Sequence, residues 1–138
     1  MSRKTARDTA MKMLYEWSLI HDTGEDSINN VLYPVDLTQQ DHVYLNNVVD
    51  GVKEHAEDID ALIARYAVGW KIERMSKVDL AVLRLAFYEL LYRDDIPASV
   101  TVNEAVELAK SYGTDDSASF INGLLGQYLR QKPSADKA

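Results

Sequence analysis

The sequence predicts an all-α protein of about seven helices, arranged as two small helical bundles that pack together. Apolar residues recur at helical spacing along most of the chain, signals that start or end helices lie between these stretches, and no strand pattern of useful length occurs. The chain has 138 residues, of which 46% are hydrophobic, so it can bury a core as one domain. We expect an N-terminal helical half at about 1–69, a C-terminal half at about 70–131 and a disordered tail at 132–138.

Three helices are predicted in the N-terminal half. The first covers about residues 3–20, because its apolar residues fall on one side of a helix at about 100° per residue. Those residues are Ala6, Ala10, Met13, Leu14 and Trp17. Residues 21–36 contain a glycine, an Asn-Asn pair and a proline, which are typical of a connecting loop. A second helical region begins at Thr38, with Gly51 a weak point near its end, and a further helix ends before Gly69.

The helix after residue 76 is predicted to lie at the centre of the fold. Ser76 can cap its first turn, with Asp79 three residues on in a position like that of a capping box. Up to about Tyr92 the helix is apolar on nearly every side, and such a helix belongs inside a bundle. Residues 70–75, before it, form a short joint to which no helix is assigned.

Two further helices complete the C-terminal half. Thr101 and Glu104 form a second capping-box pattern, and Gly113 is placed to end that helix in a left-handed conformation. Asp115 or Asp116 can cap the last helix. Its apolar stripe consists of Phe120, Ile121, Leu124, Leu125 and Tyr128.

The net charge of −7 is unevenly distributed and argues against a general nucleic-acid binder. Residues 1–20 carry four bases against two acids, a local net charge of +2. Residues 21–68 carry two bases against ten acids, and residues 69–138 nine against ten. This asymmetry permits a localised anion site at the N-terminal end of an otherwise acidic protein.

The composition argues against several kinds of chemistry. The absence of cysteine excludes disulfides and thiolate chemistry. The three histidines are scattered, and the six glycines form no phosphate-binding or dinucleotide-binding pattern. Acidic pairs at 94–95 and 115–116 stand where turns and caps explain them. We therefore expect no enzymatic activity, no metal and no cofactor.

No apolar run approaches the roughly 18–20 residues that span a bilayer. The N-terminus also lacks the apolar segment of a signal peptide. We expect a soluble, cytoplasmic protein without membrane contact.

Four segments carry a resemblance to a known family. In chain order they are ARDTAMKMLYEW, VDLAVLRLAFYELLYRDDIP, VNEAVELAKSYG and FINGLL. Together they resemble the NusB family of transcription antitermination factors over most of the chain, apart from the loop at 21–36 and the tail. The combination of Asn-Glu-Ala on one helix with Phe-Ile-Asn-Gly on the next, in this order, makes the resemblance specific.

The resemblance implies a bacterial, all-helical RNA-binding protein without enzymatic activity. Members of the family pair with a small-subunit ribosomal protein, the NusE factor, and together bind a single-stranded boxA element of nascent RNA. That complex joins other Nus factors on RNA polymerase and suppresses premature termination, notably in ribosomal RNA operons. Some members are thought to form homodimers through the surface otherwise used for RNA or partner, and that alternative stays open.

Candidate RNA-binding residues lie in both halves. Phosphates need cations, and unpaired bases need flat side chains on which to stack, at about 1–3 kcal/mol for each base. The candidates are Arg3, Lys4, Arg7 and Tyr15 near the N-terminus, together with Arg84 and Phe120, which match positions that resemble the family's RNA-facing surface.

Each candidate also has a structural alternative. The three N-terminal cations can be a solvated helix start, and Tyr15 can pack between the two halves. Arg84, the lone cation midway along an apolar helix, can be the buried partner of a carboxylate. Phe120 lies on the apolar stripe of the last helix and can belong to the core.

Three residues match positions on the ribosomal-protein face of the family, namely Asp79, Tyr112 and Asp116. An acidic surface suits a basic ribosomal protein, because complementary charge speeds the encounter and fixes the orientation. Asp116 can serve as a helix cap at the same time.

Two departures from the family pattern bear on function. The N-terminus is only modestly basic, so we expect the isolated protein to bind RNA weakly and to depend on its partner. Gly126 stands where relatives often have an aspartate.

Two other functions stay open. One is an acidic helical adaptor that binds proteins without RNA contact. The other is an RNA-binding module like that fused to ribosomal RNA cytosine methyltransferases. The chain leaves no room for a methyltransferase domain after the last helix, which favours a free-standing factor.

Overall fold

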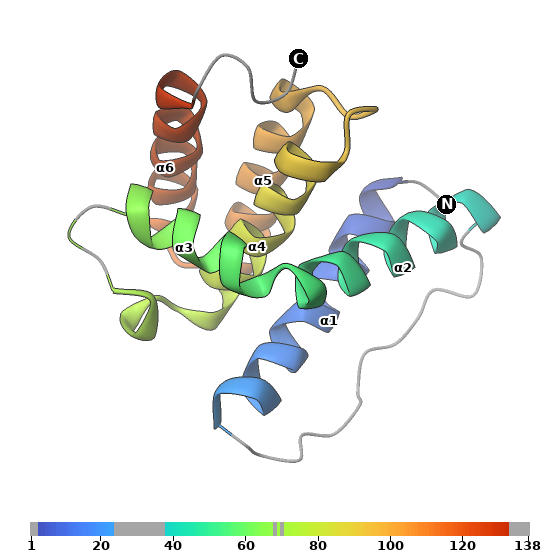
Figure 1. The fold of residues 1–138 in the computed structure, drawn as a ribbon, viewed down its shortest axis with the longest axis horizontal. Coiled ribbons are helices and arrows are strands. Elements are labelled where there is room, and N and C mark those ends of the chain that lie inside the picture. Colours follow the sequence, from blue (N-terminus) through green and yellow to red (C-terminus); the bar gives the residue numbers. More distant parts are fainter. Residues whose placement is uncertain (1–2, 24–37, 68, 70, 133–138) are drawn as a thin grey trace.

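The computed structural model describes residues 3–23, 38–67, 69 and 71–132, which form six α-helices and one short 3₁₀ helix (Figure 1). They are α1 (Arg3–Thr23), α2 (Gln39–Glu54), α3 (Ala56–Tyr66), the 3₁₀ helix η1 (Ile72–Arg74), α4 (Lys77–Tyr92), α5 (Ala98–Tyr112) and α6 (Ser117–Gln131). No strand occurs in these residues. The predicted all-α class is confirmed, with six α-helices in the described residues where about seven helices were expected, and η1 lies in the joint to which no helix was assigned.

The helix α4 lies at the centre of the fold, as its all-round apolar character predicts. It packs against each of the other five α-helices, and every residue from 80 to 90 is buried. In Figure 1, α6 lies to the left of α4, and α1 and α2 lie to its right. Aromatic rings fill the junction with α6: the ring of Tyr128 meets Phe87 at 5.0 Å and Tyr66 at 5.5 Å, both edge to face.

Two predicted helix starts are confirmed by their hydrogen bonds. The hydroxyl of Thr38 accepts from the backbone N–H of Asp41 at 3.1 Å, and that of Ser76 accepts from the N–H of Asp79 at 3.0 Å. Each bond satisfies one of the backbone donors left open in a first helical turn. α1 continues beyond the predicted residue 20 to Thr23, whereas most of the predicted loop and the tail after 132 lie outside the described residues.

The second capping-box prediction is wrong. α5 begins three residues before Thr101, at Ala98, because Pro97 stands at the N-cap with an extended backbone. Proline is tolerated at this end of a helix, where its missing N–H has no intrahelical partner. Thr101 therefore lies inside the helix and is buried, and its hydroxyl points to a carboxylate of α4 instead of capping.

The predictions around the α5–α6 turn are also corrected. Gly113 has φ −93°, so it is not left-handed; among the described glycines Gly69 has that conformation, with φ 81°. A side chain at Gly113 would collide with the side chain of Ser117, so close approach explains the glycine. Asp116 takes the N-cap position of α6, but its side chain makes no capping hydrogen bond. The turn is held instead by the Ser117 hydroxyl, which accepts from the N–H of Thr114 at 3.0 Å.

The division into two halves stays a prediction. α1 and α2 pack on each other and on α4, but α3, which was placed in the N-terminal half, packs on α6 as well as on α2 and α4. In the described part of the chain, no helix is long and apolar enough to cross a membrane.

Gly51 allows α2 to approach α4 closely. A Cβ at this buried position would collide with the ring of Tyr88, which is itself only 7% exposed. The ring of Tyr88 is held in place, with Tyr92 at 5.1 Å and His55 at 6.5 Å between ring centroids. The approach therefore explains a glycine inside a helix, where glycine costs about 1 kcal/mol relative to alanine.

We expect Gly51→Ala to lower the free energy of unfolding by about 1–2 kcal/mol, because the displaced Tyr88 ring costs more than the gain in helix propensity. Urea unfolding followed by far-UV circular dichroism measures it. Gly123→Ala is the matched control, since Gly123 is a glycine of α6 with nothing within 4 Å of the position that a Cβ would take. That variant should gain about 0.4–1 kcal/mol. Equal stability of the two variants would contradict the close approach.

Candidate functional site

The four bases of α1 all have carboxylate partners. Arg3 Nε lies 3.6 Å from Asp41 Oδ1, Lys4 Nζ 3.5 Å from Glu104 Oε1, Arg7 Nε 2.8 Å from Glu89 Oε2, and Lys12 Nζ 3.0 Å from Asp8 Oδ2. Three of these carboxylates come from other helices, namely α2, α5 and α4. The local positive charge read from the first 20 residues is therefore largely neutralised in the folded protein.

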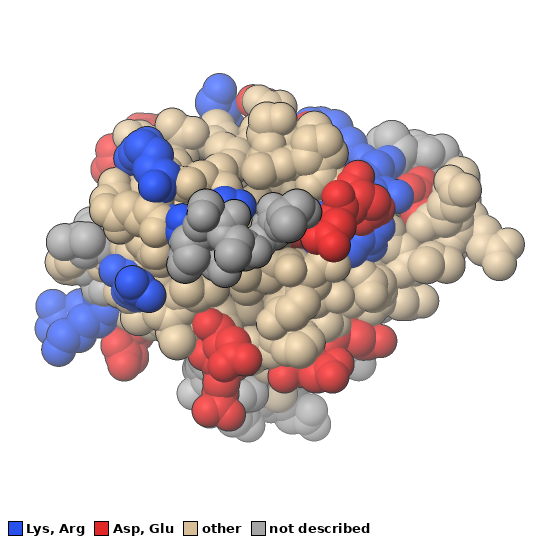
Figure 2. Space-filling view, turned by 45° about the horizontal axis from the view of Figure 1, so that its top comes forward, with Lys and Arg blue, Asp and Glu red and all other residues tan. Residues whose placement is uncertain are grey.

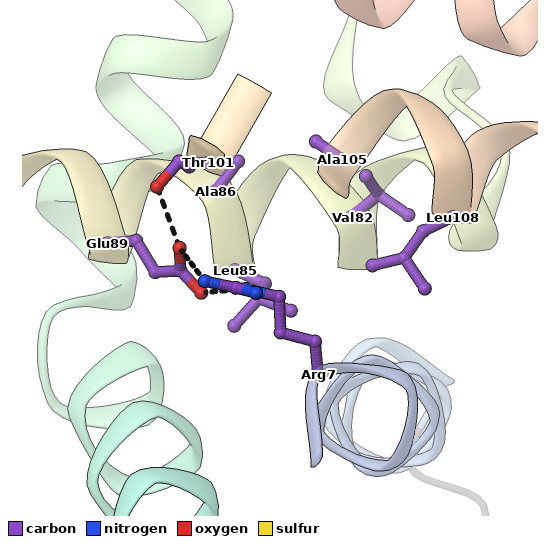
Figure 3. A pocket seen from close by; sticks show the side chains of 8 residues that line it. All are labelled: Arg7, Val82, Leu85, Ala86, Glu89, Thr101, Ala105 and Leu108. Carbon is purple, nitrogen blue, oxygen red and sulfur yellow. Dashed lines mark hydrogen bonds and ion pairs between the residues drawn. The ribbon is translucent and has the colours of Figure 1, made fainter. Parts of the chain in front are cut away.

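Arg7 belongs to a buried cluster centred on Glu89 (Figure 3). Its Nε and NH2 donate to the two carboxylate oxygens at 2.8 and 3.3 Å. The hydroxyl of Thr101 donates at 2.7 Å, and the hydroxyl of Tyr44 donates to the same carboxylate. The Glu89 cluster (Arg7, Tyr44, Glu89 and Thr101) thus joins α1, α2 and α5 to α4. A two-point guanidinium–carboxylate contact of this kind is strong and geometrically specific.

Burial and charge act together on the protonation of this cluster. Burial by itself would lower the pKa of Arg7, but the hydrogen bond and the charge of Glu89 raise it above its ordinary value. Burial, and then the charge of Glu89, raise the pKa of the Tyr44 hydroxyl. Tyr44 therefore stays a hydrogen-bond donor and Arg7 stays charged at neutral pH.

The space beside Arg7 and Glu89 is too small for a ligand. A cavity of about 10 Å³ is lined by the apolar side chains of α4 and α5 that Figure 3 shows, including Val82, Leu85 and Leu108. Such a volume is at the lower limit for a single water molecule. A phosphate group cannot enter it, and Arg7 is only 6% exposed. The predicted contact between Arg7 and RNA would require the Glu89 cluster to open.

Arg84 is the buried partner of a carboxylate, as the structural alternative to RNA binding predicted for this residue. It is 2% exposed, and its Nε and NH2 donate to Asp60 at 2.9 and 2.8 Å. NH1 donates to the hydroxyl of Ser18 at 3.2 Å, and the guanidinium lies 5.3 Å from the ring of Trp17. These contacts join α1 and α3 to α4. A phosphate would have to displace Asp60 to reach Arg84.

The two aromatic candidates, Tyr15 and Phe120, are half-buried and pack against the core with part of their surface. Phe120 separates two surface hollows of about 390 and 370 Å³. The first lies between the starts of α4 and α6, and the second between the end of α3 and α6. Phe120 therefore packs against the core and also lines both hollows.

The first hollow brings two of the predicted partner-binding residues together. Asp79 and Asp116 both line it, together with Phe120 and one base, Arg74. Asp79 Oδ1 is buried and has no hydrogen-bond partner in the described part of the protein. A buried carboxylate oxygen without a donor is costly, so this hollow favours a ligand group that donates hydrogen bonds.

Tyr112, the third predicted partner-binding residue, lies elsewhere. It is 40% exposed, and its hydroxyl donates to Asp8 Oδ1 at 2.5 Å, which links the end of α5 to α1. Lys12 Nζ lies 5.0 Å from the centre of its ring. Tyr112 is not among the residues that line the hollow with Asp79 and Asp116.

The surface in Figure 2 has no single broad basic area. Basic side chains are scattered over that face, and the largest basic group borders a large acidic one. This mixture agrees with the pairing of the α1 bases to carboxylates.

Sequence reasoning missed the residues that hold the candidate cations. Glu89, Asp60, Asp41 and Glu104 were not recognised as their partners. For Glu89 a signal exists, because an ionisable residue on an otherwise apolar central helix is almost never buried without a partner. The identity of that partner cannot be read from the pattern, since Arg7 is 82 residues away.

Comparison with known proteins gives a consistent result. A sequence profile of the NusB family matches residues 4–130. The transcription antitermination protein NusB of Acetivibrio thermocellus is 49% identical over 132 residues, which cover 96% of this chain and 91% of that protein.

Solved structures agree with the sequence matches. NusB of T. maritima superposes with a TM-score of 0.82 at 35% identity, over 95% of this chain and 92% of that one. A structure of the antitermination factors NusB and NusE in complex with dsRNA matches with a TM-score of 0.74 at 25% identity, over 93% and 96%.

We expect Glu89→Gln to lower the free energy of unfolding by about 3 kcal/mol, because it leaves the buried guanidinium of Arg7 without an anion. Urea unfolding at neutral pH provides the measurement. Glu107→Gln removes the same charge from an exposed pair with Lys110 and should change stability by less than about 0.5 kcal/mol. If the two variants lose the same stability, the Glu89 cluster does not stabilise the fold in this way.

Proposed function

Because this chain belongs to the NusB family, we propose that it is an RNA-binding transcription antitermination factor that works together with NusE. In this proposal the pair binds a single-stranded boxA element of nascent RNA. It then joins other Nus factors on RNA polymerase in the cytoplasm and helps the polymerase read through terminators, notably in ribosomal RNA operons. The observation that carries the proposal is the similarity, over nearly the whole chain, to a NusB that was solved with NusE and RNA.

The exposed end of α1 is the proposed contact for RNA phosphates. The side chain of Lys4 is 67% exposed and that of Arg3 35% exposed, so both can reach a phosphate without unfolding. The half-buried rings of Tyr15 and Phe120 are the proposed stacking surfaces. Arg7 and Arg84 are buried, and we assign them a positioning role, in which they hold α1 against α4 through Glu89 and Asp60.

The charge distribution supports weak RNA binding by the isolated protein. Every base of α1 is paired with a carboxylate, and the whole chain carries a net charge of −7. RNA affinity depends on the number of phosphates that free cations neutralise. The partner is therefore proposed to supply much of the RNA-binding surface.

The hollow beside Asp79 and Asp116 is the proposed contact for NusE. Asp116 is exposed, and Asp79 has a buried oxygen that lacks a donor among the described residues. A lysine, an arginine or a backbone N–H of a basic protein would supply that donor. Tyr112 extends the proposed contact only if NusE also covers the end of α5, because it lies outside the hollow.

One observation favours a second candidate function, an adaptor that binds proteins without RNA contact. The pairing of all four α1 bases leaves no unpaired lysine or arginine on that helix, all of which the structure describes. Such a protein would bind its partner through the hollow beside Asp79 and Asp116 alone.

Titration of a fluorescent boxA-like RNA separates the two functions. We expect weak binding by the protein alone, and at least about tenfold tighter binding in the presence of NusE. The affinity should fall as salt rises, since phosphate contacts release counterions. An RNA of shuffled sequence is the control. If no RNA binds in the presence of NusE while NusE itself is still bound, the adaptor function is correct and the RNA-binding function is wrong.

We expect Asp79→Asn to weaken NusE binding by about tenfold, because it removes the charge from an oxygen proposed to meet a basic partner. Calorimetric titration with NusE measures the change. Asp115→Asn is the matched control: Asp115 carries the same charge, is exposed beside Asp116 and does not line the hollow. Equal effects of the two variants would contradict the proposed contact.

A further inference from the structure

Lys4 is the most exposed cation of α1, yet it is paired in the folded protein. We propose that Glu104 is an affinity-determining residue of the RNA site, whose carboxylate competes with RNA phosphate for Lys4. Glu104 then limits how tightly the isolated protein binds RNA. The inference rests on the proposed RNA-binding function, to which it adds a residue that lowers the affinity for RNA.

The two side chains of this pair differ in freedom. The Lys4 side chain is 67% exposed, whereas that of Glu104 is 22% exposed. Glu104 lies with Arg7 and Leu108 along a small hollow of about 40 Å³ between α1 and α5. The carboxylate is therefore fixed on α5, and the flexible lysine can turn either to Glu104 or to a phosphate. A lysine ammonium is a compact charge with three donors, which suits such an exchange.

The distance between Lys4 and Glu104 allows the lysine to exchange the carboxylate for a phosphate. Lys4 Nζ and Glu104 Oε1 are 3.5 Å apart, which is an ion pair and longer than a good charge-assisted hydrogen bond. Exposed pairs of this kind are weak, and a phosphate at Lys4 can displace the carboxylate. The nearby negative charge of Glu104 would still repel that phosphate, so the carboxylate reduces RNA affinity without abolishing it.

The other three pairs of α1 do not serve this role. Arg7 is sealed within the Glu89 cluster. Arg3 is held by more than its carboxylate, since its guanidinium lies 4.4 Å from the centre of the Tyr44 ring. Lys12 is paired at 3.0 Å within its own helix and lies over the ring of Tyr112. Lys4 can be released with the least disturbance of the core.

The first test compares two variants of α5 that remove the same charge. Glu104→Gln releases Lys4, whereas Glu107→Gln releases Lys110, with which Glu107 is paired at 3.6 Å on the same helix. A fluorescent boxA-like single-stranded RNA is titrated with each protein in complex with NusE at low salt. We expect Glu104→Gln to bind about twofold to fivefold tighter than Glu107→Gln, the range that an exposed ion pair supplies.

The second test asks whether the effect passes through Lys4. Lys4→Met keeps the unbranched side chain and removes the charge. In this background Glu104→Gln should bind RNA no tighter than Glu107→Gln, because no lysine remains to be released. Thermal unfolding of each variant checks that the fold is kept, and Glu104→Asp, which shortens the side chain, serves as a second variant with an intermediate gain.

The outcomes separate the inference from the function on which it rests. If the wild-type complex binds RNA and Glu104→Gln gains no more than Glu107→Gln, the competition by Glu104 is wrong and the RNA-binding function stands. A gain that persists in the Lys4→Met background also overturns the inference, since it would then be a general charge effect. If no variant binds RNA with NusE present, the proposed function fails and the inference falls with it.

Discussion

The carboxylate of Glu89 is the interaction on which the arrangement of the helices depends. It lies on the central helix α4 and accepts hydrogen bonds from α1, α2 and α5 through Arg7, Tyr44 and Thr101. A charge buried among apolar side chains is tolerated only when it is paired and fully hydrogen-bonded. This requirement constrains the rotation of α1, α2 and α5 relative to α4. It also fixes where the first turn of α1 emerges, and with it Arg3 and Lys4.

The same pairing of charges shapes the surface that is proposed to bind RNA. Three of the four α1 bases are matched by carboxylates of other helices. The pair of Lys4 with Glu104 is exposed enough to exchange partners, whereas the pair of Arg7 with Glu89 is buried inside the fold. The helix α1 therefore keeps little unpaired positive charge, so a partner that adds cations or displaces the carboxylates would control the affinity of this surface for RNA. The acidic hollow at Asp79 and Asp116 lies apart from α1 among residues of α4, α6 and the turns before them.

Prediction from sequence succeeded where the structure is local. The helix start at Thr38, the cap at Ser76 and the end of α4 at Tyr92 depend on residues within a few positions of one another. It failed at Thr101, because the helix begins three residues earlier, after Pro97, and the buried hydroxyl of Thr101 donates to Glu89 of α4 instead of capping. At Gly113 the predicted end of the helix is confirmed but the left-handed conformation is wrong, because the glycine is required by its close approach to Ser117, which depends on how the α5–α6 turn closes. The sequence could not show that Arg7 and Arg84, two of the candidate RNA-binding residues, are buried in the folded protein.

The sequence by itself determined the fold class, most helix boundaries and the family, because periodicity, capping and ordered motifs are properties of neighbouring residues. Only the tertiary structure decided which of the charged residues can meet a ligand. The partners that decide it are distant in the chain: Arg7 and Glu89 are 82 residues apart, and Arg84 and Asp60 are 24 apart. The burial and the ion pairing of a side chain arise only when the helices pack, so the residue type at a given position does not predict them.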